Sequence, residues 1–175
     1  MLAWQAGQEG GNSVTDVLSG KVSPSGKLTM TFPNKLMDVA SSTNFPMDAR
    51  ANTDVRNKED KSSSVKNVDY TDYEEDIFVG YRYFDSFGKQ VSYPFGYGLS
   101  YTTFEYVNPS VKVDNGIYSV SIDVKNVGKF AGKEVVQLYV SAPNRFSDEP
   151  NRKKNLKLLP KTKELRPGET VTATL

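Results

Sequence analysis

The pattern of apolar and polar residues changes along the chain, and residues 1–34 have the pattern of an α/β unit. After a short apolar start, "MLAW", and a glycine-rich turn, apolar residues recur at helical spacing at Val14, Val17 and Leu18. Gly20 is suited to end that helix in the left-handed conformation. The alternation of "KLTMTF" (27–32) predicts a strand, and "MLAW" resembles the end of another. Strand, turn, helix and strand in about 30 residues match a βαβ unit.

Residues 35–100 have two textures, polar up to about residue 69 and aromatic after it. The polar part has no sustained period, which indicates an extended connector between domains or a loop that walls a pocket. Thirteen of the chain's twenty aromatic residues lie between positions 70 and 106. They are Tyr70, Tyr73, Phe78, Tyr81, Tyr83, Phe84, Phe87, Tyr93, Phe95, Tyr97, Tyr101, Phe104 and Tyr106. Rings at this density favour packing, with stacking on sugar rings as the alternative.

Residues 101–175 alternate as strands of an all-β domain. Strands are predicted over 101–113, 116–127, 133–142 and 169–175, with a fifth around 156–159. The turns between them are marked by "DNG", "GKFAG" and "RPG". Short strands with regularly spaced turns predict a β-sandwich, and these five fall short of the seven strands of an immunoglobulin-like domain. We therefore expect a sandwich that is truncated at its C-terminal end.

Composition narrows the chemistry. Hydrophobic residues make up 37% and charged residues 25%, so a packed core is expected. The net charge of +1 gives no field to attract nucleic acid, and no apolar run approaches the roughly 20 residues of a membrane span. The chain has no cysteine and no histidine, so acid–base chemistry would rest on Asp, Glu, Lys or Tyr. Without a phosphate-loop motif or a metal-ligand spacing, we predict no cofactor and no metal.

Glu9 is the carboxylate whose position most resembles a site. It lies between glycines in "GQEGGNS" (7–13), where a turn leads into the predicted helix. Free N–H groups and the helix dipole favour a carboxylate there by roughly 0.3–1 kcal/mol. Three roles are open: a helix cap within the turn, a contact with a sugar or a neighbouring domain, and a proton donor. Because the dipole favours the ionised form, we predict a scaffold role and keep Glu9 as a candidate for substrate contact.

Three groups of motifs in one order carry a resemblance to a known family. They are "GQEGGNSVTDVLSGKVSPSGKLTMTFP" (7–33), "DIFVGYRYFD" (76–85) with "YPFGYGLSYTTFEY" (93–106), and "VKNVGKFAGKEVVQLYVSAP" (124–143) with "LRPGE" (165–169). Together they span most of the chain. The sequence resembles the C-terminal part of family 3 glycoside hydrolases of the β-glucosidase type.

The resemblance implies an α+β architecture. Residues 1–34 would end the α/β sandwich domain, 35–100 would be the connector, and 101–175 a fibronectin type III-like sandwich lacking its last strands. The family's barrel, with its nucleophilic aspartate, and the upstream part of the α/β domain, with its acid/base glutamate, would be missing partners. The chain would then hold no catalytic residue, and carbohydrate would bind through the parent enzyme. Family members are often periplasmic or secreted, although "MLAWQAGQ" lacks the features of a signal peptide.

A retaining mechanism needs two carboxyl groups about 5 Å apart, and the other carboxylates of the chain do not suggest such a pair. Asp16 is expected on a solvated helix face, and the cluster at 74–76 (Glu74, Glu75 and Asp76) on an exposed bend, so neither predicts a catalytic pair with Glu9. Arg82, between two tyrosines, is predicted to form a buried structural pair, with clamping of a carboxylate or stacking on a ring as the alternatives. A rival function is a stand-alone binding module whose aromatic segment docks polysaccharide or a partner protein.

Overall fold

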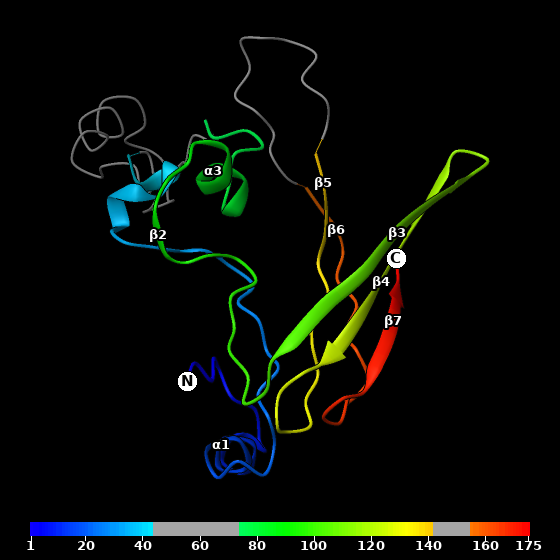
Figure 1. The fold of residues 1–175 in the computed structure, drawn as a ribbon. Coiled ribbons are helices and arrows are strands. Elements are labelled where there is room, and N and C mark those ends of the chain that lie inside the picture. Colours follow the sequence, from blue (N-terminus) through cyan, green and yellow to red (C-terminus); the bar gives the residue numbers. More distant parts are fainter. Residues whose placement is uncertain (44–73, 142–154) are drawn as a thin grey trace, which may run out of the picture. The chain divides into compact units, whose positions relative to one another are not determined.

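The computed structural model describes residues 1–43, 74–141 and 155–175 (Figure 1). The chain divides into two compact units, each taken by itself below. The first unit comprises Met1–Leu28, Gly96–Val140 and Leu156–Leu175, and the second comprises Thr29–Phe95 and Ser141–Asn155. Helices and strands occur together, which confirms a mixed α and β protein. Within the described ranges, no helix is long and apolar enough to cross a membrane.

Helix α1, Gly10–Leu18, forms where the apolar spacing predicts it. It ends at Ser19, and Gly20 follows with φ +78°, the left-handed conformation that glycine adopts without strain. The strand predicted for "MLAW" is wrong, because residues 1–6 are exposed and pair with no strand among the described residues. A strand needs a neighbour for its backbone hydrogen bonds, and the α1 segment supplies none.

The strand predicted over 27–32 is also wrong. Only its last residue becomes a strand, in β1 (Phe32–Pro33), which pairs with β2 (Val91–Tyr93) in the second unit. Within the first unit, the Leu28 N–H donates to the Tyr97 carbonyl at 2.8 Å, and the Gly96 N–H donates to the Leu28 carbonyl at 2.8 Å. A Cβ on Gly98 would collide with the carbonyl of Gly26, so the two segments lie too close for a side chain there. The backbone of Leu28 thus bonds to residues about 70 positions away in sequence, and the predicted strand has no regular strand ladder.

The first unit contains an antiparallel sheet in the order β3–β4–β7 (Figure 1). Its strands are β3 (Phe104–Asp114), β4 (Ile117–Asn126) and β7 (Thr170–Thr174). Asn115 and Gly116, with φ +48° and +80°, join β3 to β4 in the left-handed pair that a two-residue hairpin requires. The strands predicted over 101–113, 116–127 and 169–175 are thus confirmed.

A second, two-stranded sheet joins β5 (Leu138–Val140) to β6 (Asn155–Leu158). Bridges continue this pairing between Gly132 and Leu165 and between Val135 and Lys161. The fifth strand predicted around 156–159 is confirmed as β6. The strand predicted over 133–142 is confirmed only at Leu138–Val140, and residue 142 lies outside the described residues. Before Leu138 a side chain interrupts the ladder, because the Glu134 N–H donates to the Thr162 hydroxyl at 2.9 Å.

Val124, Val136 and Leu165 form the buried core of the first unit. Alternation on β4 places Ile122 and Val124 on the same face. The partly buried residues packed against them are Phe104, Ile122, Val171, Ala173 and Leu175. The opposite face of the sheet is polar, and there Asp123 accepts hydrogen bonds from the Thr172 hydroxyl at 2.6 Å and from the Asn108 amide at 3.0 Å.

Asn126, with none of its surface exposed, ties the ends of the core strands together. Its Oδ1 accepts from the Thr102 hydroxyl at 2.6 Å and from the Gly128 N–H at 3.0 Å. Its Nδ2 donates to the carbonyls of Phe130 and Leu165, both at 2.8 Å. The side-chain amide therefore makes four hydrogen bonds, and its burial costs no unpaired polar atom.

The second unit contains two 3₁₀ helices, Leu36–Asp38 and Ala40–Thr43, and helix α3, Tyr81–Ser86. Its aromatic side chains pack on one another: the ring centroids of Phe78 and Phe87 lie 5.2 Å apart, as do those of Tyr83 and Phe87, and Phe84 is buried. Packing is thus the observed use of these described rings. Tyr70 and Tyr73, together with most of the polar connector, lie outside the described residues.

Candidate functional site

Glu9 lies immediately before α1, where the sequence places it. Its backbone carbonyl accepts the Ser13 N–H at 2.9 Å, the bond that begins the helix. Its side chain makes no cap to a backbone N–H, so that part of the prediction is wrong. The carboxylate instead accepts a hydrogen bond from the Asn12 amide at 2.6 Å. Asn12 lies three residues later, in the first turn of α1, so Glu9 braces this turn through a side chain and not through a backbone N–H.

The glycines around Glu9 follow from a tight turn. The Gly10 N–H donates to the Gly7 carbonyl at 3.0 Å, which folds the chain back before the helix. A Cβ on Gly10 would collide with the Cβ of Ala6. A Cβ on Gly7 or Gly11 would meet nothing within 4 Å. The close approach of Ala6 therefore explains why position 10 of this motif is a glycine.

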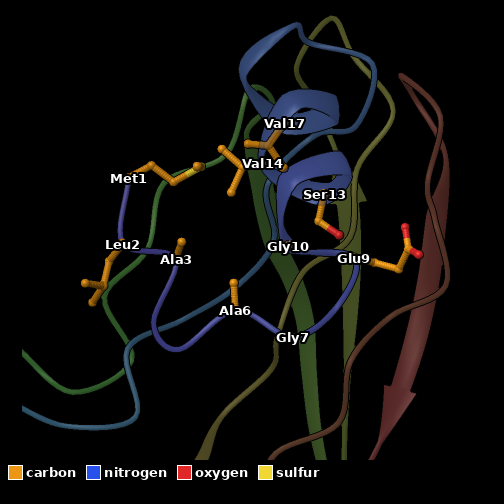
Figure 2. A pocket seen from close by; sticks show the side chains of 10 residues that line it. All are labelled: Met1, Leu2, Ala3, Ala6, Gly7, Glu9, Gly10, Ser13, Val14 and Val17. Atoms are coloured by element: carbon orange, nitrogen blue, oxygen red, sulfur yellow. The ribbon is translucent and has the colours of Figure 1, made fainter.

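A hollow of about 330 Å³ opens beside this turn. Its lining is Met1, Leu2, Ala3, Ala6, Gly7, Glu9, Gly10, Ser13, Val14 and Val17 (Figure 2). Figure 2 shows the Glu9 carboxylate directed away from Met1 and Leu2. Sites that select a small polar ligand place several polar groups around it, whereas this lining is mostly aliphatic. The hollow is therefore suited to receive apolar surface.

The other candidate carboxylates contact partners other than Glu9. Asp16 forms an exposed ion pair with Lys21 at 2.9 Å, in agreement with a solvated position. In the second unit, the Phe78 N–H donates to the Glu75 carbonyl at 2.9 Å, and Asp76 adopts φ +50°. That segment is a turn, as predicted, with Glu74 and Asp76 exposed, but Glu75 is half-buried, so the prediction of an exposed cluster is wrong for Glu75.

The buried pair predicted for Arg82 is wrong. Arg82 is exposed, and its guanidinium carbon lies 5.9 Å from the centroid of the Tyr81 ring. This is the stacking alternative. Phe84 is the buried residue of helix α3. Arg82 is two residues earlier, on the opposite side of the helix, and therefore points to solvent.

An ion pair that sequence reasoning missed lies inside the first unit. Lys27 Nζ is 3.0 Å from Glu134 Oε1 and donates to the Gly98 carbonyl at 2.9 Å. The two side chains are only 19% and 11% exposed. Glu134 also accepts the Val135 N–H at 2.7 Å. The alternation of the sequence could have indicated this pair. Glu134 is two residues before the buried Val136, so both side chains lie on the same, buried face of the segment, and a buried carboxylate requires a partner.

Tyr106 lies within the electrostatic reach of this pair. Desolvation, and secondarily the negative charge of Glu134, raises the pKa of Tyr106 to about 12. The phenol is therefore neutral and cannot serve as a base near neutral pH. On the opposite face of the sheet, the hydrogen bonds from Thr172 and Asn108 lower the pKa of Asp123. Neither shift creates a group that titrates near neutrality.

Residues 1–101 match the family described as "Glycosyl hydrolase family 3 C-terminal domain". The chain belongs to this family. It is 44% identical over 174 residues to a β-glucosidase of Kluyveromyces marxianus, covering 99% of this chain and 18% of that protein. It is 46% identical over 179 residues to thermostable β-glucosidase B of Acetivibrio thermocellus, covering 99% and 21%.

The solved structures agree with this assignment. β-Glucosidase 3B of Thermotoga neapolitana in complex with glucose is 44% identical, with a TM-score of 0.81 over 98% of this chain and 22% of that one. The chain thus spans about a fifth of the length of these relatives. The family predicted from the motifs is confirmed, and the stand-alone binding module is not favoured.

Proposed function

We propose that this chain is the C-terminal scaffold of a longer β-glucosidase-type enzyme, a retaining, exo-acting hydrolase of O-glycosyl bonds. The observation that carries the proposal is the similarity over 98–99% of the chain to proteins named β-glucosidase, one of them in complex with glucose. The substrate class is a terminal glucoside, or a closely related sugar, held by the parent enzyme.

The catalytic carboxyl pair is assigned to the part of the enzyme outside this chain. The described carboxylates discussed above are engaged separately: Glu9 with an amide, Asp16 and Glu134 with lysines, and Asp123 with a hydroxyl and an amide. A retaining mechanism needs two carboxyl groups about 5 Å apart and free to exchange a proton. Because each of these carboxylates binds a different partner, their contacts support a scaffold role for Glu9.

The proposed domain organisation follows the family. Residues 1–34 end the α/β sandwich domain and 35–100 form the connector. Residues 101–175 contribute strands β3 to β7 to a fibronectin type III-like sandwich. The packing of Val124 of one sheet against Val136 and Leu165 supports two layers with one core.

The partners of the chain are then the barrel and the rest of the α/β domain of the same polypeptide. The aliphatic hollow beside α1 supports this assignment, because Met1 and Leu2 on its rim are 70% and 49% exposed. Export to the periplasm or the medium stays a prediction, which fractionation of the native host would test.

The test uses an aryl β-glucoside and two proteins, the 175-residue chain and the longer natural polypeptide that contains it. We expect turnover only from the longer protein. In that protein Glu9→Gln should leave kcat and KM unchanged, with Asn12→Ala as the matched variant that removes the same hydrogen bond from the other side. Turnover by the 175-residue chain that disappears on Glu9→Gln would refute both the fragment and the scaffold assignment.

A further inference from the structure

The turn between β3 and β4 carries the only Asn–Gly pair of the sequence, Asn115–Gly116. Both residues are exposed and left-handed, with φ +48° and +80°. The hairpin ladder ends at the pair Asp114–Ile117, and β7 pairs only with residues 121–125, further along β4. The turn therefore lies at the tip of the hairpin, beyond the end of β7 (Figure 1).

The side-chain amide of Asn115 and the backbone nitrogen of Gly116 form a reactive pair. The amide carbon is electrophilic, and attack by the nitrogen of the next residue closes a cyclic imide. A side chain at the next position hinders that attack, whereas Gly116 has none, and even a Cβ there would meet nothing within 4 Å. No hydrogen bond joins the Asn115 amide to a described residue, so no group in this part of the chain holds the amide in place.

Three other described asparagines show what these features contribute. Asn108 is also exposed, with φ +54°, but Pro109 follows it and has no N–H to lose. Asn12 donates its amide to Glu9 at 2.6 Å within the first turn of α1. Asn126 is fully buried, and its amide makes four hydrogen bonds. Each of the three lacks a condition that Asn115 meets.

Ring closure also requires a rotation of the backbone between Asn115 and Gly116, which opens the turn. The free energy of local opening is smallest at exposed loop tips and largest in the core. At the hairpin tip, the rotation lies beyond the last ladder pair and leaves the rest of the ladder closed. The same rotation would break the first turn of α1 at Asn12 and open the core at Asn126. The fold therefore protects those two positions and leaves Asn115 open to reaction.

We propose that Asn115 is a site of spontaneous chemical modification, in which the turn converts its own asparagine to aspartate or isoaspartate. The Gly116 nitrogen loses its proton and forms a bond to the side-chain carbon of Asn115, and the bond from that carbon to the amide nitrogen breaks, so ammonia leaves. Water then opens the cyclic imide. Opening at the side-chain carbonyl gives aspartate, and opening at the backbone carbonyl gives isoaspartate.

The two products change the turn in different ways. Both add a carboxylate beside Asp114 and lower the formal net charge of the chain from +1 to zero. Isoaspartate also routes the backbone through the side chain, which lengthens it by one atom. Because a two-residue hairpin turn fixes the register of its strands, the pairing of Asp114 with Ile117 cannot stay as it is. The reaction thus loosens the hairpin from its tip.

The experiment incubates the longer natural polypeptide that contains this chain at mildly alkaline pH, with and without urea. Peptide mass spectrometry follows the loss of the amide at each asparagine, and electron-transfer fragmentation distinguishes aspartate from isoaspartate. Asn115→Gly is the matched variant, because glycine keeps the positive φ of the turn without strain and carries no amide. Ion-exchange chromatography of the parent and of the variant detects the more acidic product.

We expect Asn115 to lose its amide at least tenfold faster than Asn12, Asn108 and Asn126 without urea, and to give both products. Urea should accelerate the reaction at Asn12 and Asn126 more than at Asn115, because only the first two are protected by the fold. The proposal is overturned if Asn115 reacts no faster than Asn12, or reacts only in urea. It is also overturned if Asn115→Gly develops as much acidic product as the parent. Aryl β-glucoside turnover does not enter these measurements, so the proposed function can fail or hold independently.

Discussion

Replacing Asn126 by leucine should destabilise the first unit substantially, although the two side chains have similar shapes. The substitution leaves four polar groups without the partner that the amide provides. Two of them are buried, the Thr102 hydroxyl and the Leu165 carbonyl, and the Gly128 N–H and Phe130 carbonyl lie in partly buried surroundings. Each buried group left unpaired costs about 1–3 kcal/mol.

The partly buried groups can reach water. The Leu165 carbonyl keeps the Gly132 N–H at 3.1 Å, so we count mainly the Thr102 hydroxyl and expect a loss of about 2–3 kcal/mol in the free energy of unfolding. A domain of this size has about 5–15 kcal/mol in total, so the variant should lose a substantial share of its stability. A loss of this size would separate Asn126 clearly from surface asparagines.

Urea unfolding followed by circular dichroism measures the effect. Asn12→Ala is the matched control, because it removes one exposed hydrogen bond to Glu9 and should cost within about 0.5 kcal/mol. If Asn126→Leu changes the unfolding midpoint no more than Asn12→Ala does, the four-bond network does not hold the strand ends together and the reasoning is refuted.

Three further predictions follow from the charged and titrating groups. Lys27→Met should cost about 2–4 kcal/mol in urea unfolding, because it leaves the carboxylate of Glu134 buried without its cation. The Tyr106 phenol, whose folded pKa is raised from 10.0 to about 12, contributes stability that is complete below pH 10 and is lost as pH rises toward 12. Its late titration should disappear from the tyrosinate absorbance in Tyr106→Phe. The lowered pKa of Asp123 contributes stability that is present above its ordinary pKa of 3.8 and is lost as pH falls through the folded value. Thr172→Val should move that pKa, followed by NMR, back toward 3.8.

Each of these has a result that contradicts it. Lys21→Met breaks an exposed pair with Asp16 and should have little effect on the free energy of unfolding. The prediction for Lys27 is contradicted if Lys27→Met lowers that free energy no more than Lys21→Met does. For Tyr106, the contrary result is an absorbance titration that Tyr106→Phe leaves unchanged in its upper range. For Asp123, it is an unaltered NMR titration in Thr172→Val, which would assign the shift to another cause.

Local patterns in the sequence determined the elements whose hydrogen bonds lie within the element or at its own turn. Helix α1 closes its bonds within nine residues and ends just before Gly20, so the apolar spacing predicts the helix and one glycine predicts its C-terminal end. The hairpin β3–β4 is equally local, because Asn115 and Gly116 set the turn and alternation sets the faces. The motif order likewise identified the family, since motifs are local strings.

Contacts distant in sequence were decided only by the tertiary structure. Residues 27–32 alternate like a strand, yet Leu28 bonds to Gly96 and Tyr97, because strand pairing depends on whichever backbone lies alongside. The Glu9 carboxylate turned to Asn12, where propensity favoured a backbone cap. The partner of Glu134 is 107 residues away, at Lys27. Periodicity reports which face of an element is apolar, but the group that approaches that face is set by how the chain folds back on itself.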